Sequence, residues 1–165
     1  MSPTPQPHES DWIRPPPRIH VGPGSRRRGI VLDAGKPLIL IVDDSVDARE
    51  IYSASLTHSG YRVLTEPDGE LGLHTAIGQR PDVIVMDLSM PRLDGIDATR
   101  YLKRNYRTRS IPVIMLTGYP FEAINKEVLE AGVHVFLTKP CLPEELERNI
   151  RQVLVRKRRA TGEAT

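Results

Sequence analysis

The chain has 165 residues, 39% of them apolar and 27% charged, which suffices for one domain of ordinary size with a buried core. The sequence contains neither a signal-peptide pattern nor an apolar run near the roughly 18 residues that a membrane span needs. Its single cysteine, Cys141, excludes an internal disulfide and fits a reducing compartment. These features predict a soluble, cytoplasmic protein without membrane contact.

The net charge of +2 hides an uneven distribution. Residues 1–36 carry a net charge of +3 and residues 151–165 carry +4, so residues 37–150 carry −5. The basic run "RKRR" (156–159) comes with no aromatic platform and no second basic element. We therefore interpret it as a solvated helix end rather than a nucleic-acid contact.

The beginning of the chain differs in composition from the rest. Seven prolines lie in the first 36 residues, including "PPP" at 15–17, and "GPGSRRRG" occupies 22–29. Such a stretch has too few large apolar side chains to offset the entropy that is lost on ordering. We predict a disordered, Pro/Arg-rich N-terminal tail over residues 1–35, with Trp12 as its one large apolar anchor.

After this tail, short apolar runs alternate with helical patterns. The first run, "PLILIV" (37–42), precedes a helical pattern over 46–58 that places Ile51 on its buried face. A second, β-branched run, "YRVLT" (61–65), precedes a weaker helical pattern over 68–79. The part of the sequence after the tail thus begins with two pairs, each of a strand followed by a helix.

Three further pairs complete the pattern. The strands are predicted at 82–86, 111–117 and 133–138, and the helices at 94–106, 121–131 and 143–157. Tyr106 falls on the apolar face of its predicted helix. Most of the strand runs are continuously apolar rather than alternating, which is typical of parallel strands covered on both faces. Five strands alternating with five helices predict a three-layer α/β fold with a parallel sheet.

Polar side chains stand where these predicted strands end. Asp43 and Asp44 follow the first strand, Asp87 the third, Thr117 ends the fourth, and Lys139 follows the fifth. The carboxyl ends of parallel strands meet at one edge of a sheet, where ligands usually bind. We therefore expect these five side chains to converge in one shallow cleft.

Three carboxylates in one cleft repel each other, so one of them would retain a proton unless a cation lay nearby. A magnesium ion fits this need, because it takes oxygen ligands and keeps several waters. Lys139 supplies a further positive charge. By contrast, we interpret Asp94 and Asp97 as helix-cap or turn residues, and the five histidines lack metal-ligand spacing.

Four motifs resemble the receiver domain of bacterial two-component response regulators. They are "LIVDDS" (40–45), "VIVMDLSMPRLDG" (83–95), "PVIMLTG" (112–118) and "FLTKP" (136–140), in that order. The resemblance covers about residues 36–157, which we take as the receiver domain, and leaves residues 158–165 as a short C-terminal tail. It implies a flavodoxin-like (βα)5 fold, like that of chemotaxis regulators, with the strand order 2-1-3-4-5.

The resemblance also implies a site. Asp87 would accept a phosphoryl group from a histidine of a sensor kinase. Asp44, Asp87 and the backbone carbonyl of Ser89 would bind Mg²⁺ directly, and Asp43 would bind it through water. The loop after Asp87, with its proline and glycine, would be a turn that holds this arrangement.

Three further residues receive roles from the same resemblance. Thr117 would donate its hydroxyl to one phosphoryl oxygen, and Lys139 would pair with another. Phe136 matches a switch aromatic, whose ring turns inward when Thr117 moves toward the phosphate. The Lys139–Pro140 bond matches one that is usually cis in the family.

Only eight residues follow the last predicted helix, too few for a DNA-binding domain or an enzymatic output module. We therefore expect a stand-alone response regulator that is not an enzyme beyond its own phosphoryl transfer and dephosphorylation. Its partners would be a sensor histidine kinase and a downstream protein, and it would be a monomer or a phosphorylation-dependent dimer.

Three alternatives remain open. The protein could pass its phosphate to a histidine phosphotransfer domain, or it could be a degenerate receiver that binds partners without phosphate. It could also be a magnesium-dependent aspartyl phosphatase of the haloacid dehalogenase type. That class requires a second aspartate two residues after the nucleophile. In this chain, Ser45 stands two residues after Asp43 and Ser89 two residues after Asp87.

Overall fold

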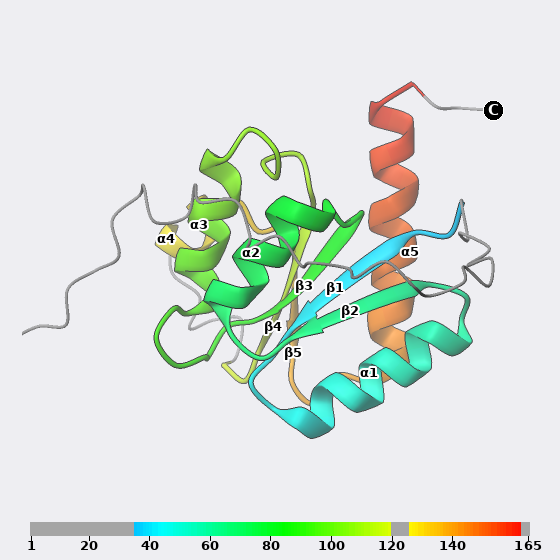
Figure 1. Ribbon diagram of the computed structural model, residues 1–165, viewed down its shortest axis with the longest axis horizontal. Coiled ribbons are helices and arrows are strands. Elements are labelled where there is room, and N and C mark those ends of the chain that lie inside the picture. Colours follow the sequence, from blue (N-terminus) through cyan, green and yellow to red (C-terminus); the bar gives the residue numbers. More distant parts are fainter. Residues whose placement is uncertain (1–34, 120–125, 163–165) are drawn as a thin grey trace, which may run out of the picture. The chain divides into compact units, whose positions relative to one another are not determined.

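Five strands form one parallel sheet in the computed structural model, which describes residues 35–119 and 126–162 (Figure 1). Their order across the sheet is β2-β1-β3-β4-β5, and each neighbouring pair is parallel. The predicted flavodoxin-like α/β fold is confirmed. The strands are β1 (Leu38–Val42), β2 (Arg62–Glu66), β3 (Val83–Asp87), β4 (Val113–Thr117) and β5 (Val135–Thr138).

Helices cover both faces of the sheet. α1 (Val46–His58) and α5 (Pro143–Ala160) pack together on one face, and α2 (Gly69–Gln79) and α3 (Gly95–Arg104) on the other (Figure 1). α4 (Lys126–Glu130) precedes β5, and residues 121–125 of the helix predicted at 121–131 lie outside the described residues. Within the described segments, no helix combines the length and the apolar character needed to cross a bilayer.

Burial explains why the sequences of the central strands are continuous apolar runs. Every residue of β1, β3 and β4 is buried, because helices cover both sides of these strands. The edge strands β2 and β5 contain exposed and half-buried residues instead. The rigid centre of the sheet therefore consists of the strands whose ends carry the three aspartates and Thr117.

Side-chain caps set the helix starts. The Ser45 hydroxyl accepts a hydrogen bond from the Ala48 N–H at 3.2 Å at the start of α1. The Asp94 carboxylate accepts one from the Asp97 N–H at 2.9 Å at the start of α3. This bond confirms the interpretation of Asp94 as a cap, and Asp97 pairs with Arg100 within the first turn of the same helix.

Two side chains placed on buried helix faces from the sequence are exposed. Ile51 of α1 is 56% exposed and Tyr106 is 73% exposed. α3 ends at Arg104, two residues before the predicted end, and the Thr108 hydroxyl donates to the Leu102 carbonyl at 2.8 Å. Tyr106 therefore follows the helix rather than lying on it.

We expect that deletion of residues 1–34 will leave the unit Gly35–Thr165 folded. The chain divides into Met1–Ala34 and Gly35–Thr165, and the composition of the first segment cannot supply a core. The melting temperature should change by less than about 2 °C, and the rate of the phosphorylation that the resemblance implies should be unchanged. Differential scanning calorimetry of both chains measures this, and a large drop in melting temperature would mean that the first segment stabilises the domain.

Candidate functional site

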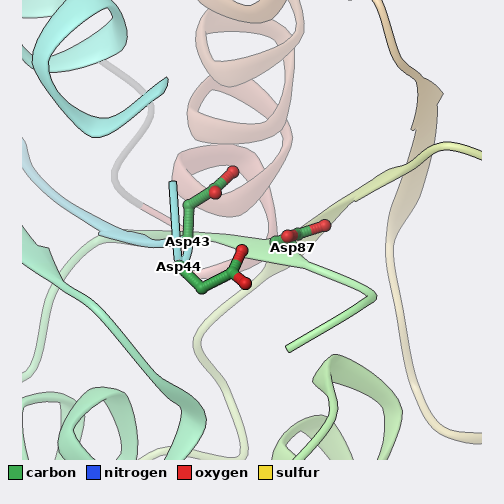
Figure 2. A group of neighbouring side chains, drawn as sticks. All are labelled: Asp43, Asp44 and Asp87. Carbon is green, nitrogen blue, oxygen red and sulfur yellow. The ribbon is translucent and has the colours of Figure 1, made fainter. Parts of the chain in front are cut away.

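Three carboxylates lie together at the carboxyl edge of the sheet, as predicted (Figure 2). Asp43 and Asp44 directly follow β1, and Asp87 is the last residue of β3. The pairing of Val42 with Met86 in the two adjacent strands places Asp43 beside Asp87. One carboxylate oxygen of each aspartate lies within 4.8 Å of the others. Asp43 and Asp87 are buried, whereas Asp44 is exposed.

Lys139 joins this cluster from the loop after β5. Its ammonium lies 2.9 Å from Asp43 Oδ2 and 3.3 Å from Asp87 Oδ1. The Lys139 backbone N–H donates to the Thr117 carbonyl at 2.7 Å, which places the loop beside the end of β4. The Lys139–Pro140 bond is cis, as the resemblance implied. The ammonium therefore bridges the two buried carboxylates.

The electrostatics follow from burial and these short distances. Burial raises the pKa of Asp87 above its ordinary value, and the Asp43 charge raises it further, while Lys139 opposes both. Burial alone would lower the pKa of Lys139, but its hydrogen bond to Asp43 and the charge of Asp87 raise it overall. Lys139 therefore remains a cation at neutral pH, and Asp87 holds a proton more readily than an ordinary aspartate.

Local hydrogen bonds orient Asp43. One of its carboxylate oxygens, Oδ1, accepts from the Ser45 N–H at 2.9 Å, while Oδ2 accepts from Lys139. Its backbone carbonyl accepts from the Arg49 guanidinium of α1 at 2.7 Å. These bonds connect Asp43 to the start of α1 and to the loop after β5.

The loop after β3 holds Asp87 in a similar way. The Ser89 N–H donates to Asp87 Oδ1 at 3.3 Å, and the Gly95 N–H donates to the Leu88 carbonyl at 2.9 Å. A Cβ atom at Gly95 would collide with the Asp87 carbonyl, so only glycine allows this close approach. The turn residues seen in the sequence therefore bring α3 directly against the acidic strand end.

Thr117 was also predicted at this edge, and Phe136 was predicted as a switch aromatic. Thr117 ends β4, is 1% exposed, and its hydroxyl accepts from the Tyr119 N–H at 3.0 Å. Phe136 lies on β5, where it pairs with Met115 of β4 and is half-buried. The four charged residues thus lie together, Thr117 ends the neighbouring strand, and Phe136 lies three residues before Lys139.

The sequence of this chain is similar to a known protein family. A sequence profile described as the response regulator receiver domain matches residues 39–151, which is more than half of the chain. The chain belongs to the response regulator receiver family. The resemblance stated from the four sequence motifs is therefore confirmed.

Curated relatives of this receiver domain include transcriptional regulators. The probable transcriptional regulator ycf27 of Guillardia theta is 38% identical over 125 residues, which span 76% of this chain and 48% of the relative. The alkaline phosphatase synthesis transcriptional regulatory protein PhoP of Bacillus subtilis is 36% identical over 118 residues, or 72% of this chain and 48% of that protein. The chain spans about half the length of the curated relatives it matches.

Solved structures of similar proteins match over nearly their whole length. The chemotaxis protein CheY4 of Vibrio cholerae has a TM-score of 0.68 at 31% identity, covering 72% of this chain and 98% of that one. The receiver domain of the sensor histidine kinase PA1611 of Pseudomonas aeruginosa has a TM-score of 0.67 at 34% identity, with the same coverage. That second structure contains a magnesium ion coordinated in its active-site cleft.

The acidic cluster of this receiver domain is of the type that binds Mg²⁺. Its three carboxylates offer oxygen ligands within 4.8 Å of each other, and oxygen is the ligand that Mg²⁺ prefers. The exposed Asp44 leaves one side of the cluster open to water, and Mg²⁺ usually retains several waters. The donor set therefore fits this ion.

Two contacts between distant parts of the chain could not be predicted from the sequence. Arg92, in the loop after β3, adopts a positive φ of 68° and forms an ion pair of 2.5 Å with Asp68, which caps α2. Tyr52 of α1 donates to the backbone carbonyl of Cys141 at 2.9 Å. Each contact connects elements far apart in the sequence, so no local pattern could predict it.

We expect Mg²⁺ binding to weaken as the pH falls through the raised pKa of Asp87. The ion requires the ionised carboxylate, and burial moves the pKa of Asp87 above its ordinary 3.8, so affinity is lost at a higher pH than for an ordinary aspartate. Below that pKa, the apparent Kd should rise about tenfold per pH unit. Calorimetric titrations measure the Kd, and a Kd that stays constant down to the ordinary pKa would show that Asp87 does not have a raised pKa.

Proposed function

We propose that this receiver domain accepts a phosphoryl group on Asp87 from a phosphohistidine of a sensor kinase in a Mg²⁺-dependent reaction. The observation that carries the proposal is the position of the Asp87 carboxylate. It ends a buried strand, lies beside Asp43 and Asp44, and has the Lys139 ammonium 3.3 Å from its oxygen. A phosphoryl group on Asp87 would therefore lie close to the positive charge of Lys139.

In this reaction an Asp87 carboxylate oxygen attacks phosphorus while the bond from phosphorus to the histidine nitrogen breaks, and the imidazole leaves. Phosphoryl transfer depends mainly on positioning and charge neutralisation. Lys139 neutralises charge on the phosphoryl oxygens. Thr117 already accepts a hydrogen bond from the Tyr119 N–H, and its own hydroxyl proton can be donated to a phosphoryl oxygen.

The resemblance to receiver domains implies the metal ligands. Asp44, Asp87 and the backbone carbonyl of Ser89 would hold Mg²⁺ directly, with Asp43 acting through water. The bound ion would neutralise negative charge between the carboxylates and the incoming phosphoryl group. Asp43 also holds Lys139 at 2.9 Å, so it orients the ammonium as well.

We further propose that phosphorylation signals through protein contact. Thr117 would move toward the phosphoryl group, Phe136 would turn inward, and the surface around β5 and the start of α5 would change. A ligand shifts such an equilibrium only through contacts that differ between the two states, here those of Thr117 and Lys139. The receiver would act in the cytoplasm, as a signalling module rather than an enzyme. Its partners would be a sensor histidine kinase and a downstream protein.

The test is incubation of the full chain with Mg²⁺ and acetyl phosphate, followed by intact mass measurement and a phosphate-retarding gel. One phosphoryl group per chain is expected, and none when the metal is chelated beforehand. Steady release of phosphate from a phosphomonoester, without a stable phosphorylated chain, would favour the phosphatase alternative. No labelling under any condition would favour a degenerate receiver.

A further inference from the structure

A tyrosine of α1 contacts the loop that carries Lys139. The Tyr52 hydroxyl donates a hydrogen bond to the Cys141 carbonyl at 2.9 Å, across 89 residues of sequence. The bond is buried, and Tyr52 is only 7% exposed. We propose that Tyr52 is a positioning residue, which holds the segment 139–142 against α1 so that the Lys139 ammonium stays between Asp43 and Asp87. This inference rests on the proposed phosphoryl transfer to Asp87.

Hydrogen bonds hold the backbone on both sides of the Lys139 side chain. On the N-terminal side, the Lys139 N–H donates to the Thr117 carbonyl at 2.7 Å. After it, Pro140 has no N–H to donate, and the Cys141 carbonyl accepts the hydrogen bond from Tyr52. The two bonds bracket Lys139 between β4 and α1.

The helix that supplies Tyr52 also orients the partner of Lys139. α1 begins directly after Asp44, and Arg49 of α1 donates to the Asp43 backbone carbonyl at 2.7 Å. Tyr52 follows Arg49 by three residues, so both contacts come from neighbouring positions of one helix. α1 therefore fixes Asp43 and the Lys139 loop relative to each other.

The environment of Tyr52 supports its role as a donor. Burial raises the pKa of its hydroxyl, so the proton needed for the hydrogen bond is retained. The charges of Lys139, Asp43 and Asp87 all act on this hydroxyl, which places it close to the site. A phenylalanine at this position would keep the ring and leave the buried Cys141 carbonyl without its donor.

The loop would then shift toward another donor, and the ammonium would shift with it. Small displacements of a group that positions a reaction can lower its rate by about 10²-fold. Because Lys139 has a flexible stem that can follow part of the shift, we expect Tyr52→Phe to slow phosphorylation by about tenfold. The Mg²⁺ ligands lie outside this loop, so the Kd for Mg²⁺ should stay within about twofold.

The experiment measures both quantities with acetyl phosphate and Mg²⁺ on the full chain. The matched control is Tyr61→Phe, which also removes one tyrosine hydroxyl and its hydrogen bond, here to Glu147 at 3.0 Å. Tyr61→Phe should match wild type in rate and in Mg²⁺ affinity. Tyr52→p-aminophenylalanine, which keeps an N–H donor, should recover most of the lost rate.

A double-variant comparison separates positioning from general packing. In a Lys139→Ala background, Tyr52→Phe should cause little further loss of rate, because the group that it positions is gone. An equal loss in both backgrounds, or a parallel loss of Mg²⁺ affinity, would overturn the positioning role. So would a wild-type rate in Tyr52→Phe. If wild type itself accepts no phosphoryl group, the proposed function fails instead.

Discussion

Asp87→Asn is expected to abolish phosphorylation by acetyl phosphate, lowering its rate by at least about 10²-fold. Asparagine keeps the shape of the side chain but its amide is not a nucleophile for phosphorus. The substitution also removes a buried negative charge and its repulsion from Asp43, the two causes that raise the pKa of Asp87. Folding should therefore be preserved or improved, and the comparison requires only the labelling rate and a thermal melt.

Asp94→Asn provides the matched control. Asp94 is also an aspartate after β3, but its carboxylate caps α3 through the Asp97 N–H at 2.9 Å. Asparagine is a good N-cap as well, so both stability and labelling should match wild type. Labelling of Asp87→Asn at the wild-type rate and at one defined site would show that another residue is the acceptor.

Lys139→Ala is expected to lower the phosphorylation rate by about 10²-fold while Mg²⁺ still binds. The ammonium lies 2.9 Å from Asp43 and 3.3 Å from Asp87 but is not a metal ligand. Its removal leaves the carboxylates and takes away the charge that would neutralise the phosphoryl oxygens. Calorimetric Mg²⁺ titration and labelling rates, measured on the same preparation, separate the two effects.

Lys139→Arg tests whether charge alone is sufficient. Arginine keeps the positive charge but replaces a compact ammonium with a planar fork, so we expect a rate between those of wild type and Lys139→Ala. Loss of Mg²⁺ binding in Lys139→Ala, or a wild-type labelling rate, would contradict the role given to this lysine.

The sheet and its acidic edge could be predicted from the sequence for a physical reason. Strands buried on both faces must be apolar along their whole length, so β1, β3 and β4 stand out without any structure. Parallel pairing then brings their carboxyl ends to one edge. Asp43, Asp44, Asp87 and Lys139 accordingly meet where the sequence placed them.

Side-chain contacts between distant elements could not be predicted in this way. The Tyr52 bond to Cys141 and the Arg92 pair with Asp68 depend on how helices and loops approach each other in space. Helical periodicity was also a poor guide at the margins of a helix face. The pattern places Ile51 on the buried side of α1. The face that α1 buries is too narrow to include Ile51, which is 56% exposed.

Phosphorylation of Asp87 is tested most directly by locating the phosphoryl group on the wild-type chain. After reaction with acetyl phosphate and Mg²⁺, borohydride reduces an aspartyl phosphate to homoserine, and peptide mass spectrometry identifies its position. We expect homoserine at position 87, only when Mg²⁺ is present, with Asp43 and Asp44 unchanged. Homoserine at position 43 or 44, or a phosphate on a serine or threonine with Asp87 unmodified, would contradict it.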